Sequence, residues 1–404
     1  MFAELQVPIM RDTWLGRSMD INGAYRFSDY SNVGEQETYS LGVTYRPFDQ
    51  LLLRATKSTA IRVPNLSETN EPLGQTFANG FSDPCSATVI NNLADRSIAA
   101  NRIANCGALA SAAGLDLNFA DLGATNAYLP NYGSGSVPGL AGGNQFLQPE
   151  TSESFSYGFA WTPDYLLPNL AITMDYYDIE INDAIDSVSA QAAANQCVSG
   201  DQVNTLACLT QTRDATSFQV TSFIQGSLNY AALTAKGVDF SARWGGDLFR
   251  FGGRGWGSFR HAIRGNWLIE QVDYVNIDDP ADGTDYQDTV GSPRVRFLST
   301  LTWSPTDTLS FSWDWDWQAS QEIEDIDNIL ANPDRYESLK YIETGDFSQH
   351  DFSVRWDVRD DVTLRAGVVN AFDAEPARWL GNTTADNFDL FGRRFFISAN
   401  FRSF

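Results

Sequence analysis

The sequence predicts an all-β protein, an antiparallel up-and-down transmembrane β-barrel. Segments in which apolar and polar residues alternate recur along the 404-residue chain, and the connections between them are mostly short and long in turn. No run of about 18 apolar residues could cross a bilayer as a helix, whereas alternation conceals the hydropathy of a membrane strand. The hairpins predict about thirteen strands, each near the roughly 10 residues that cross a tilted bilayer.

The clearest alternation lies in the stretch LSFSWDWDWQAS, residues 309–320. Every second position is aromatic, and carboxylates lie between the tryptophans at Asp314 and Asp316. Because successive side chains of a strand point to opposite faces, this segment has one aromatic and one polar face. The pattern suits the core strand of a soluble sandwich as well as a membrane strand with tryptophan toward lipid. The connections decide between these two folds.

Short connections with proline or aspartate in turn positions lie at residues 46–50, 304–308 and 358–362. The two longest connections span about residues 65–148 and 183–230, and further ones lie at roughly 274–292, 321–345 and 371–387. An up-and-down barrel separates periplasmic turns from extracellular loops in this order, which a Greek-key sandwich has no reason to keep. We therefore expect the tryptophans to face lipid and the two aspartates to face the lumen.

The chain carries 27 basic and 51 acidic residues, a net charge of -24. This balance excludes nucleic acid as a partner, since phosphate binding requires a basic surface. Many acidic residues lie in residues 275–288, which we interpret as a solvated loop. A Ca²⁺ loop is the alternative, although the EF-hand order of ligands is absent. We expect no bound metal and no cofactor.

Four cysteines form two local pairs within the two longest loops, Cys85 with Cys106 and Cys197 with Cys208. This spacing predicts two loop-closing disulfides and hence an oxidising compartment, with free thiols as the alternative. Zinc is not indicated, because no CxxC motif occurs and the two histidines lie far from the cysteines in sequence.

Six segments, taken in order, resemble the C-terminal barrel of TonB-dependent outer-membrane receptors. RATKSTAIRVPNLSE at residues 54–68 resembles the family's strand and loop entry, and GGNQFLQPETSESFSYGFAWTP at residues 142–163 resembles its GNPxLxPE segment and the following strand. The others are MDYYDIEINDAI, KGVDFSARW, GVVNAFDAEPARW and FGRRFFISANFRSF. Departures are Gln145, where the family usually has proline, and Lys57, where an outward aromatic residue is common.

The resemblance implies a barrel of about 22 strands, with an N-terminal TonB box and a plug domain. Residues 1–404 would form the C-terminal portion of that barrel, without the plug. The start MFAELQVPIMRD lacks the basic and apolar regions of a signal peptide, so we expect the chain to be part of a longer receptor. Phe404 occupies the terminal aromatic position of the family's assembly signal, whereas Phe401 lies one residue too early for the inner position.

The resemblance further implies TonB-dependent active transport of an extracellular solute across the outer membrane of a Gram-negative bacterium. The implied partners are lipid and lipopolysaccharide, the TonB complex acting through a plug domain, the barrel-assembly machinery and a small-molecule ligand. Long loops without a cluster of His or Cys ligands favour a carbohydrate-like organic ligand over a bare metal, and a ferric siderophore is the alternative. Ligand-binding candidates are the loop residues Phe77, Tyr128, Tyr132 and Trp379 and the carboxylates of Asp314 and Asp316.

Two other classes of protein fit the sequence less well. An enzyme would need a base, for which only His261 and His350 are available as histidines, and the sequence has no GxSxG elbow. We therefore predict no catalytic residues. A passive porin or an adhesin-like barrel would not account for the ordered motifs; bilayer conductance and dependence on detergent would identify them.

Overall fold

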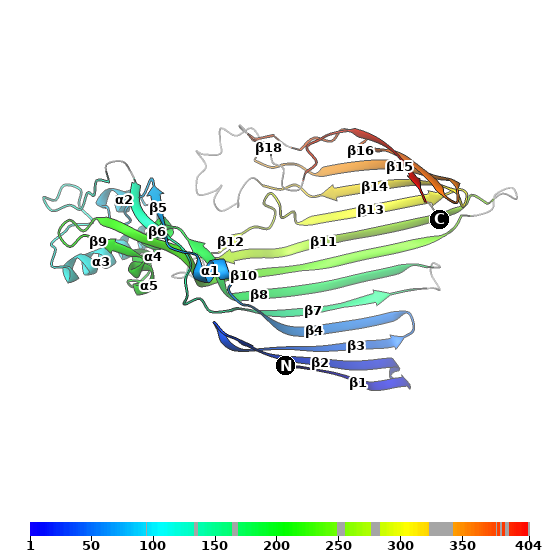
Figure 1. Ribbon diagram of the computed structural model, residues 1–404, viewed down its shortest axis with the longest axis horizontal. Coiled ribbons are helices and arrows are strands. Elements are labelled where there is room, and N and C mark those ends of the chain that lie inside the picture. The colour runs from blue at the N-terminus through cyan, green and yellow to red at the C-terminus, as the bar shows by residue number, and fades with distance from the viewer. Residues whose placement is uncertain are drawn as a thin grey trace.

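The computed structural model covers residues 1–404 and describes all of them except 94, 133–135, 164–168, 249–254, 276–282, 323–341, 377, 380–381, 384–387 and 403–404. Long antiparallel strands form one curved sheet, and a smaller part made of helices and short strands lies beyond one end of it (Figure 1). We call this smaller part the loop domain. It comprises the described residues of 63–149 and 189–225.

Each long strand pairs antiparallel with the next long strand in chain order. Within the described residues these strands number thirteen: β1 (Phe2–Thr13), β2 (Gly16–Tyr30), β3 (Gly34–Phe48), β4 (Leu51–Arg62), β7 (Glu150–Trp161), β8 (Ala171–Val188), β10 (Val220–Asp247), β11 (Ser258–Tyr274), β13 (Val295–Ser304), β14 (Leu309–Gln318), β15 (Phe347–Arg359), β16 (Val362–Val369) and β19 (Arg394–Phe401). The predicted antiparallel up-and-down sheet is confirmed.

The outermost strands of the long sheet, β1 and β19, have unpaired edges. No strand pairing joins them in the part of the chain that the structure describes, so the sheet is open. All residues of β19 are exposed, as are all residues of β1 except Met10. In hydrocarbon the N–H and C=O groups of such edges have no partner, so these strands require neighbouring strands in a membrane.

Most short turns lie at the end of the sheet that is farther from the loop domain, whereas the short connection from β2 to β3 lies at the other end (Figure 1). The turns at the farther end connect β3 to β4 after Phe48, β13 to β14 after Ser304 and β15 to β16 after Arg359, where proline and aspartate predict turns. At the other end the strands reach far into the long connections. β8 continues to Val188, and β10 runs for 28 residues from Val220.

The loop domain contains helices, which the alternation of the sequence does not predict. They are α1 (Leu66–Asn70), α2 (Ala87–Asn92), α3 (Arg96–Ala112), α4 (Ala190–Ser199) and α5 (Thr205–Leu209). Alanine has the highest helix propensity, and it is frequent in α3 and α4. Side chains cap the backbone N–H groups at four helix starts, from Asn65 at α1, Asp95 at α3, Ser189 at α4 and Asn204 at α5.

A small sheet in the loop domain consists of β5 (Gly74–Asn79), β6 (Ser136–Ala141), β9 (Gln211–Arg213) and the first residues of β10. β10 pairs with β6 through residues 223–225 and then with β8 from Gly226 onward. One unbroken strand therefore connects the loop domain to the long sheet. Three short strands complete the described elements: β12 (Thr284–Asp285), β17 (Arg378–Trp379) and β18 (Asn382–Thr383).

Most fully buried apolar side chains belong to the loop domain. One cluster surrounds the cysteines and includes Ile90, Phe119 and Phe218. A second cluster, with Val137 and Phe223, packs the small sheet against α4. Among the described residues, no helix has the length and apolar character needed to cross a membrane.

Candidate functional site

One face of the long sheet carries the tryptophans of β14. The rings of Trp313 and Trp315 stack with centroids 6.1 Å apart, and the ring of His350 from β15 lies 5.8 and 5.7 Å from them. The indole N–H of Trp313 donates to Nδ1 of His350 over 3.1 Å, which satisfies both polar atoms within an apolar surface. We call this side of the sheet the aromatic face.

The opposite side of the sheet, the polar face, carries the two aspartates of β14. Thr300 donates its hydroxyl to Asp314 over 2.6 Å, and Arg296 forms an ion pair with Asp316 at 2.9 Å. Strand alternation therefore separates the tryptophans from the carboxylates as predicted. Further charged pairs on the polar face are Arg54 with Asp175, Arg62 with Glu150 and Arg355 with Asp357.

Asp316 lines a hollow of about 480 Å³ on the long sheet between β10 and β14. Asp239, Arg264, Asn266 and Arg296 also line it. Asn266 donates to Asp239 over 2.8 Å, so part of the hydrogen-bonding capacity is already used. The hollow offers both carboxylate and guanidinium groups, which can bind the polar groups of a solute.

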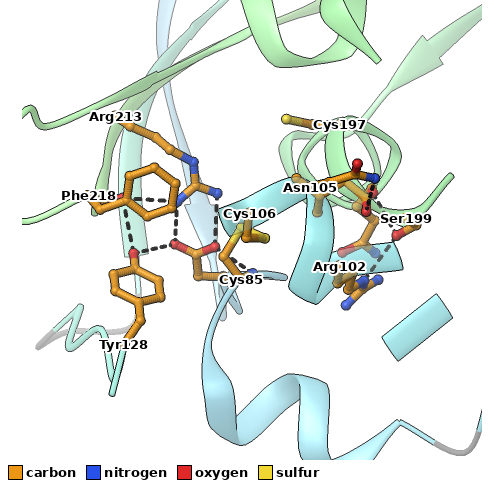
Figure 2. Close-up of a disulfide and its surroundings, with 12 residues drawn as sticks. Cys85, Arg102, Asn105, Cys106, Tyr128, Cys197, Ser199, Arg213 and Phe218 are labelled. Atoms are coloured by element: carbon orange, nitrogen blue, oxygen red, sulfur yellow. Dashed lines mark hydrogen bonds and ion pairs between the residues drawn. A yellow bond between two sulfur atoms is a disulfide. The ribbon is translucent and has the colours of Figure 1, made fainter. Parts of the chain in front are cut away.

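Both predicted disulfides are confirmed, Cys85 to Cys106 and Cys197 to Cys208. The first joins the segment before α2 to α3, and the second joins α4 to α5. Each lies beside the apolar cluster of the loop domain, and Figure 2 shows the surroundings of Cys85 and Cys106. Each disulfide thus links helical segments within one of the two longest loops.

A buried ion pair joins the two loops to each other. Both terminal nitrogens of Arg213 in β9 donate to the carboxylate of Asp83, each over 2.9 Å. Tyr128 and Tyr132 donate their hydroxyls to the same carboxylate over 2.7 and 2.8 Å. The guanidinium of Arg213 also lies 4.6 Å from the centre of the Phe218 ring; Figure 2 shows Arg213, Tyr128 and Phe218 together.

The buried cluster shifts the pKa of its members. Burial by itself raises the pKa of Asp83, but the charge of Arg213 and the hydrogen bonds from Arg213, Tyr128 and the Cys85 N–H outweigh burial and lower it below the ordinary value. Burial, followed by the negative charge of Asp83, raises the pKa of Tyr128 and of Tyr132. At neutral pH the cluster is therefore one carboxylate, one guanidinium and two neutral phenols.

Side chains of α3 bind the end of α4 in a second connection between the two loops. Asn105 donates to the carbonyl oxygens of Val198 and Gly200 over 3.0 and 2.7 Å, and Arg102 donates to the hydroxyl of Ser199 over 3.0 Å (Figure 2). Burial lowers the pKa of Arg102. Because both loops share one core, the loop domain is a single folded unit.

A pocket of about 480 Å³ lies where the loop domain meets the long sheet, and we call it the junction pocket. Its wall comes from residues 69–73 at the end of α1, residues 142–146 after β6 and residues 224–228 of β10, with Val188, Ala193 and Thr210. The ring of Phe146, at 88% exposure, is the most accessible apolar group of this wall.

The structure places the sequence-predicted ligand residues in different surroundings. Tyr128 is 4% exposed and Tyr132 is half-buried, and both hydroxyls bind Asp83. Phe77 is 52% exposed on β5. The side chain of Trp379, Phe404 and residues 276–282 of the segment 275–288 lie outside the described part of the molecule. A role in ligand binding stays a prediction for Phe77, Tyr128, Tyr132, Trp379, Asp314 and Asp316, and the assembly role of Phe404 and the interpretation of residues 275–288 likewise stay predictions.

Sequence reasoning missed the buried pair and the junction pocket. Asp83 and Arg213 lie far apart in the chain, and no local spacing indicates that they meet. The pocket combines three separate segments. A partial signal was available in GGNQF, residues 142–146, because paired glycines before polar and aromatic residues often mark a close approach of two backbones.

Antiparallel up-and-down strands with one aromatic face, one polar face and large loops at one end are characteristic of transmembrane β-barrel proteins. The chain belongs to the TonB dependent receptor-like, beta-barrel family, whose model matches residues 1–371. This membership confirms the family that the sequence resembles. No curated protein matches the chain.

Solved receptors share this fold. A mutant of the ferric enterobactin receptor from Pseudomonas aeruginosa, in complex with enterobactin, is 15% identical with a TM-score of 0.58, over 99% of this chain and 44% of that chain. The siderophore receptor PirA from Acinetobacter baumannii is 17% identical with a TM-score of 0.56, over 99% and 45%. The FrpB iron transporter from Neisseria meningitidis is 11% identical with a TM-score of 0.51, over 99% and 45%. This chain therefore spans less than half the length of the solved receptors that it resembles.

Proposed function

We propose that this chain forms part of the β-barrel of an outer-membrane receptor. The receptor carries an extracellular solute into the periplasm of a Gram-negative bacterium by TonB-dependent active transport. The main support is the opposite character of the two faces of the long sheet in a member of this receptor family. The aromatic face suits lipid and lipopolysaccharide, since aromatic residues gather at membrane interfaces. The polar face suits a hydrated passage.

The loop domain and the rim of the sheet bind the solute first. The loop domain already has a rigid core, because two disulfides and the buried pair of Asp83 and Arg213 hold it together. A preformed surface loses less conformational entropy on binding than a flexible loop does. Disulfides persist in oxidising surroundings, which supports a location of this domain on the cell surface.

Passage along the polar face is favoured by charges that are already paired. Arg54 with Asp175 and Arg355 with Asp357 neutralise each other and still leave hydrogen-bonding atoms for water or solute. The chain needs no covalent chemistry for this step. We assign the opening of the passage to a plug domain pulled by the TonB complex, and insertion of the receptor to the barrel-assembly machinery, both as proposed partners.

Two classes of solute are candidates. The solved receptors with this fold are described as receptors of ferric enterobactin and siderophores and as an iron transporter, which supports a ferric siderophore here. In that case the chelator holds the iron, and iron is cargo. A carbohydrate-like organic ligand is the second candidate, supported by the mostly uncharged lining of the junction pocket.

Growth and uptake by intact cells test the proposal. Three strains are compared on panels of sole iron sources and sole carbon sources: the parent strain, a strain without this receptor and a strain without TonB. We expect the two deletions to abolish growth on the same source and to abolish uptake of that labelled compound. If uptake continues without TonB, and the purified receptor conducts ions in a planar bilayer, the protein is a passive porin. If loss of the receptor changes neither growth nor uptake on any source, the transport proposal is wrong.

A further inference from the structure

The junction pocket has a rigid wall. The N–H of Gly142 donates to the carbonyl oxygen of Gln225 over 3.2 Å, and the N–H of Gly143 donates to that of Glu71 over 2.9 Å. A Cβ atom on Gly143 would lie 2.6 Å from the backbone nitrogen of Asn70, so only glycine fits there. Three segments of chain are thus held in contact by their backbones, and the pocket is formed before any ligand binds.

The side chains of the junction pocket are mostly uncharged. Glu71 is the one charged residue of its described lining, which contains no lysine, arginine or histidine, although the chain as a whole carries 78 charged side chains in 27 basic and 51 acidic residues. Gln145, which is exposed, and Gln225, which is half-buried, bring side-chain amides with hydrogen-bond donors and acceptors to the lining. Leu73, Phe146 and Ile224 supply exposed apolar surface.

An apolar strip leads away from this pocket along the outer face of the small sheet. Phe77 on β5, Leu140 on β6 and Ile224 on β10 are 52, 40 and 54% exposed, and Ile224 lies opposite Leu140 in the strand register. Ile224 also lines the pocket, so the pocket and the strip form one continuous surface. A ligand longer than the pocket can therefore extend over these residues.

We propose that the junction pocket binds an uncharged, hydroxyl-rich organic molecule, a neutral oligosaccharide. Amide groups can donate to and accept from hydroxyl groups, and an aromatic ring packs against the C–H face of a sugar ring. An anionic ligand would need a cation, which the described lining lacks, and would be repelled by Glu71 and by the net charge of -24. The inference rests on the proposed transport function and names the solute for this site.

Binding to outer membranes that contain the receptor tests this assignment. The probes are labelled maltotetraose, cellotetraose and chitotetraose as neutral oligosaccharides, with tetragalacturonate and ferric enterobactin as anionic comparisons. The variants are Phe146→Ala and Gln225→Ala. The matched control is Phe391→Ala, because Phe391 is also a strongly exposed phenylalanine, at 84%, and lies outside the pocket lining. Heat-modifiable mobility on gels confirms that each variant is folded in the membrane.

We expect at least one neutral oligosaccharide to bind saturably, with a dissociation constant that rises about tenfold in Phe146→Ala, as for loss of one aromatic contact, and rises also in Gln225→Ala. Phe391→Ala should bind as the parent does. The assignment is wrong if none of the neutral probes binds, or if one binds equally well to the Phe146→Ala variant. If ferric enterobactin alone binds and enters cells in a TonB-dependent manner, the transport function stands and only this assignment fails.

Discussion

Asp83 and Arg213 form a buried, bidentate ion pair across 130 residues of sequence. The Asp83 side chain is completely shielded from solvent, and the Arg213 side chain is 12% exposed. Asp83 belongs to the connection between β4 and β7, and Arg213 belongs to the connection between β8 and β10. The pair therefore fastens the two longest loops to each other at the centre of the loop domain.

The substitution Asp83→Asn should destabilise the loop domain. It leaves the guanidinium of Arg213 buried without its counter-charge, which typically costs about 3–5 kcal/mol of the free energy of unfolding. Scanning calorimetry of the purified receptor in detergent should show the loop-domain transition at a lower temperature. Adding Arg213→Met should recover most of the loss, because the double variant buries no unpaired charge.

The matched control for that prediction is Asp361→Asn. Asp361 pairs with Arg359 beside the turn between β15 and β16, in a bridge whose side chains are 38 and 69% exposed, and such pairs contribute little. We expect the same transition temperature as in the parent. An Asp83→Asn variant that unfolds no earlier than the Asp361→Asn variant would show that the buried pair does not hold the domain together.

The stability of the loop domain should fall at both ends of the pH scale. Folding lowers the pKa of Asp83 below its ordinary 3.8, so the stabilisation by the carboxylate is complete above about pH 4 and is lost as the pH falls through the folded-state pKa. Folding raises the pKa of Tyr128 and Tyr132 above their ordinary 10.0, so their stabilisation is complete below about pH 10 and is lost as the pH rises further. Transition temperatures measured across pH should form a plateau between these limits.

The double variant Tyr128→Phe and Tyr132→Phe separates the two limbs of that profile. Without ionisable phenols at the cluster, the alkaline decline should become shallower, whereas the acid limb, which depends on Asp83, should remain. An alkaline decline of unchanged steepness in this variant would assign it to groups elsewhere in the chain.

The two disulfides should differ in their rates of reduction. Cys85, Cys106 and Cys197 are at most 1% exposed, whereas Cys208 is half-buried. A thiolate reductant must reach a sulfur atom, so we expect the disulfide between Cys197 and Cys208 to be reduced first, by several-fold or more. Alkylation at timed intervals, followed by peptide mass spectrometry, measures both rates. Denaturant should remove the difference if burial causes it; a difference that persists in denaturant would contradict this explanation.

Adjacent positions on β14 should respond in opposite ways to arginine. Trp313→Arg places a charge on the aromatic face, at a cost of up to about 2–4 kcal/mol if the position lies near the middle of the bilayer. Ser312→Arg places the same charge on the polar face, where Ser312 lies 3.2 Å from the hydroxyl of Thr302. The yield of heat-modifiable folded receptor in outer membranes should fall for the first variant only. Equal yields would show that the aromatic face does not meet lipid.

The sequence was sufficient to predict the long sheet. In LSFSWDWDWQAS the alternation is local, and strand geometry sends Trp313 and Asp314 to opposite faces whatever the rest of the chain does. Short turns such as the one after Ser304 then set the register of neighbouring strands. The disulfides were also predictable, because each joins cysteines only 21 or 11 residues apart.

The loop domain and its sites depended on contacts that no local pattern encodes. Phe77, Tyr128 and Tyr132 look alike in sequence as aromatic loop residues, yet the first is exposed and the other two bind Asp83. Helix α3 also lacks the regular apolar stripe that would reveal a buried face, because it buries Arg102 and Asn105 beside Cys106.

By itself, the sequence determined which side chains share a face of each strand and where the chain turns, since both follow from the spacing of neighbouring residues. Only the tertiary structure decided which distant groups meet: Asp83 with Arg213, α3 with the end of α4, and residues 142–146 with β10. The physical reason is that burial and electrostatic pairing depend on distance in space, and the folding of two long loops into one core brings together residues that the chain separates.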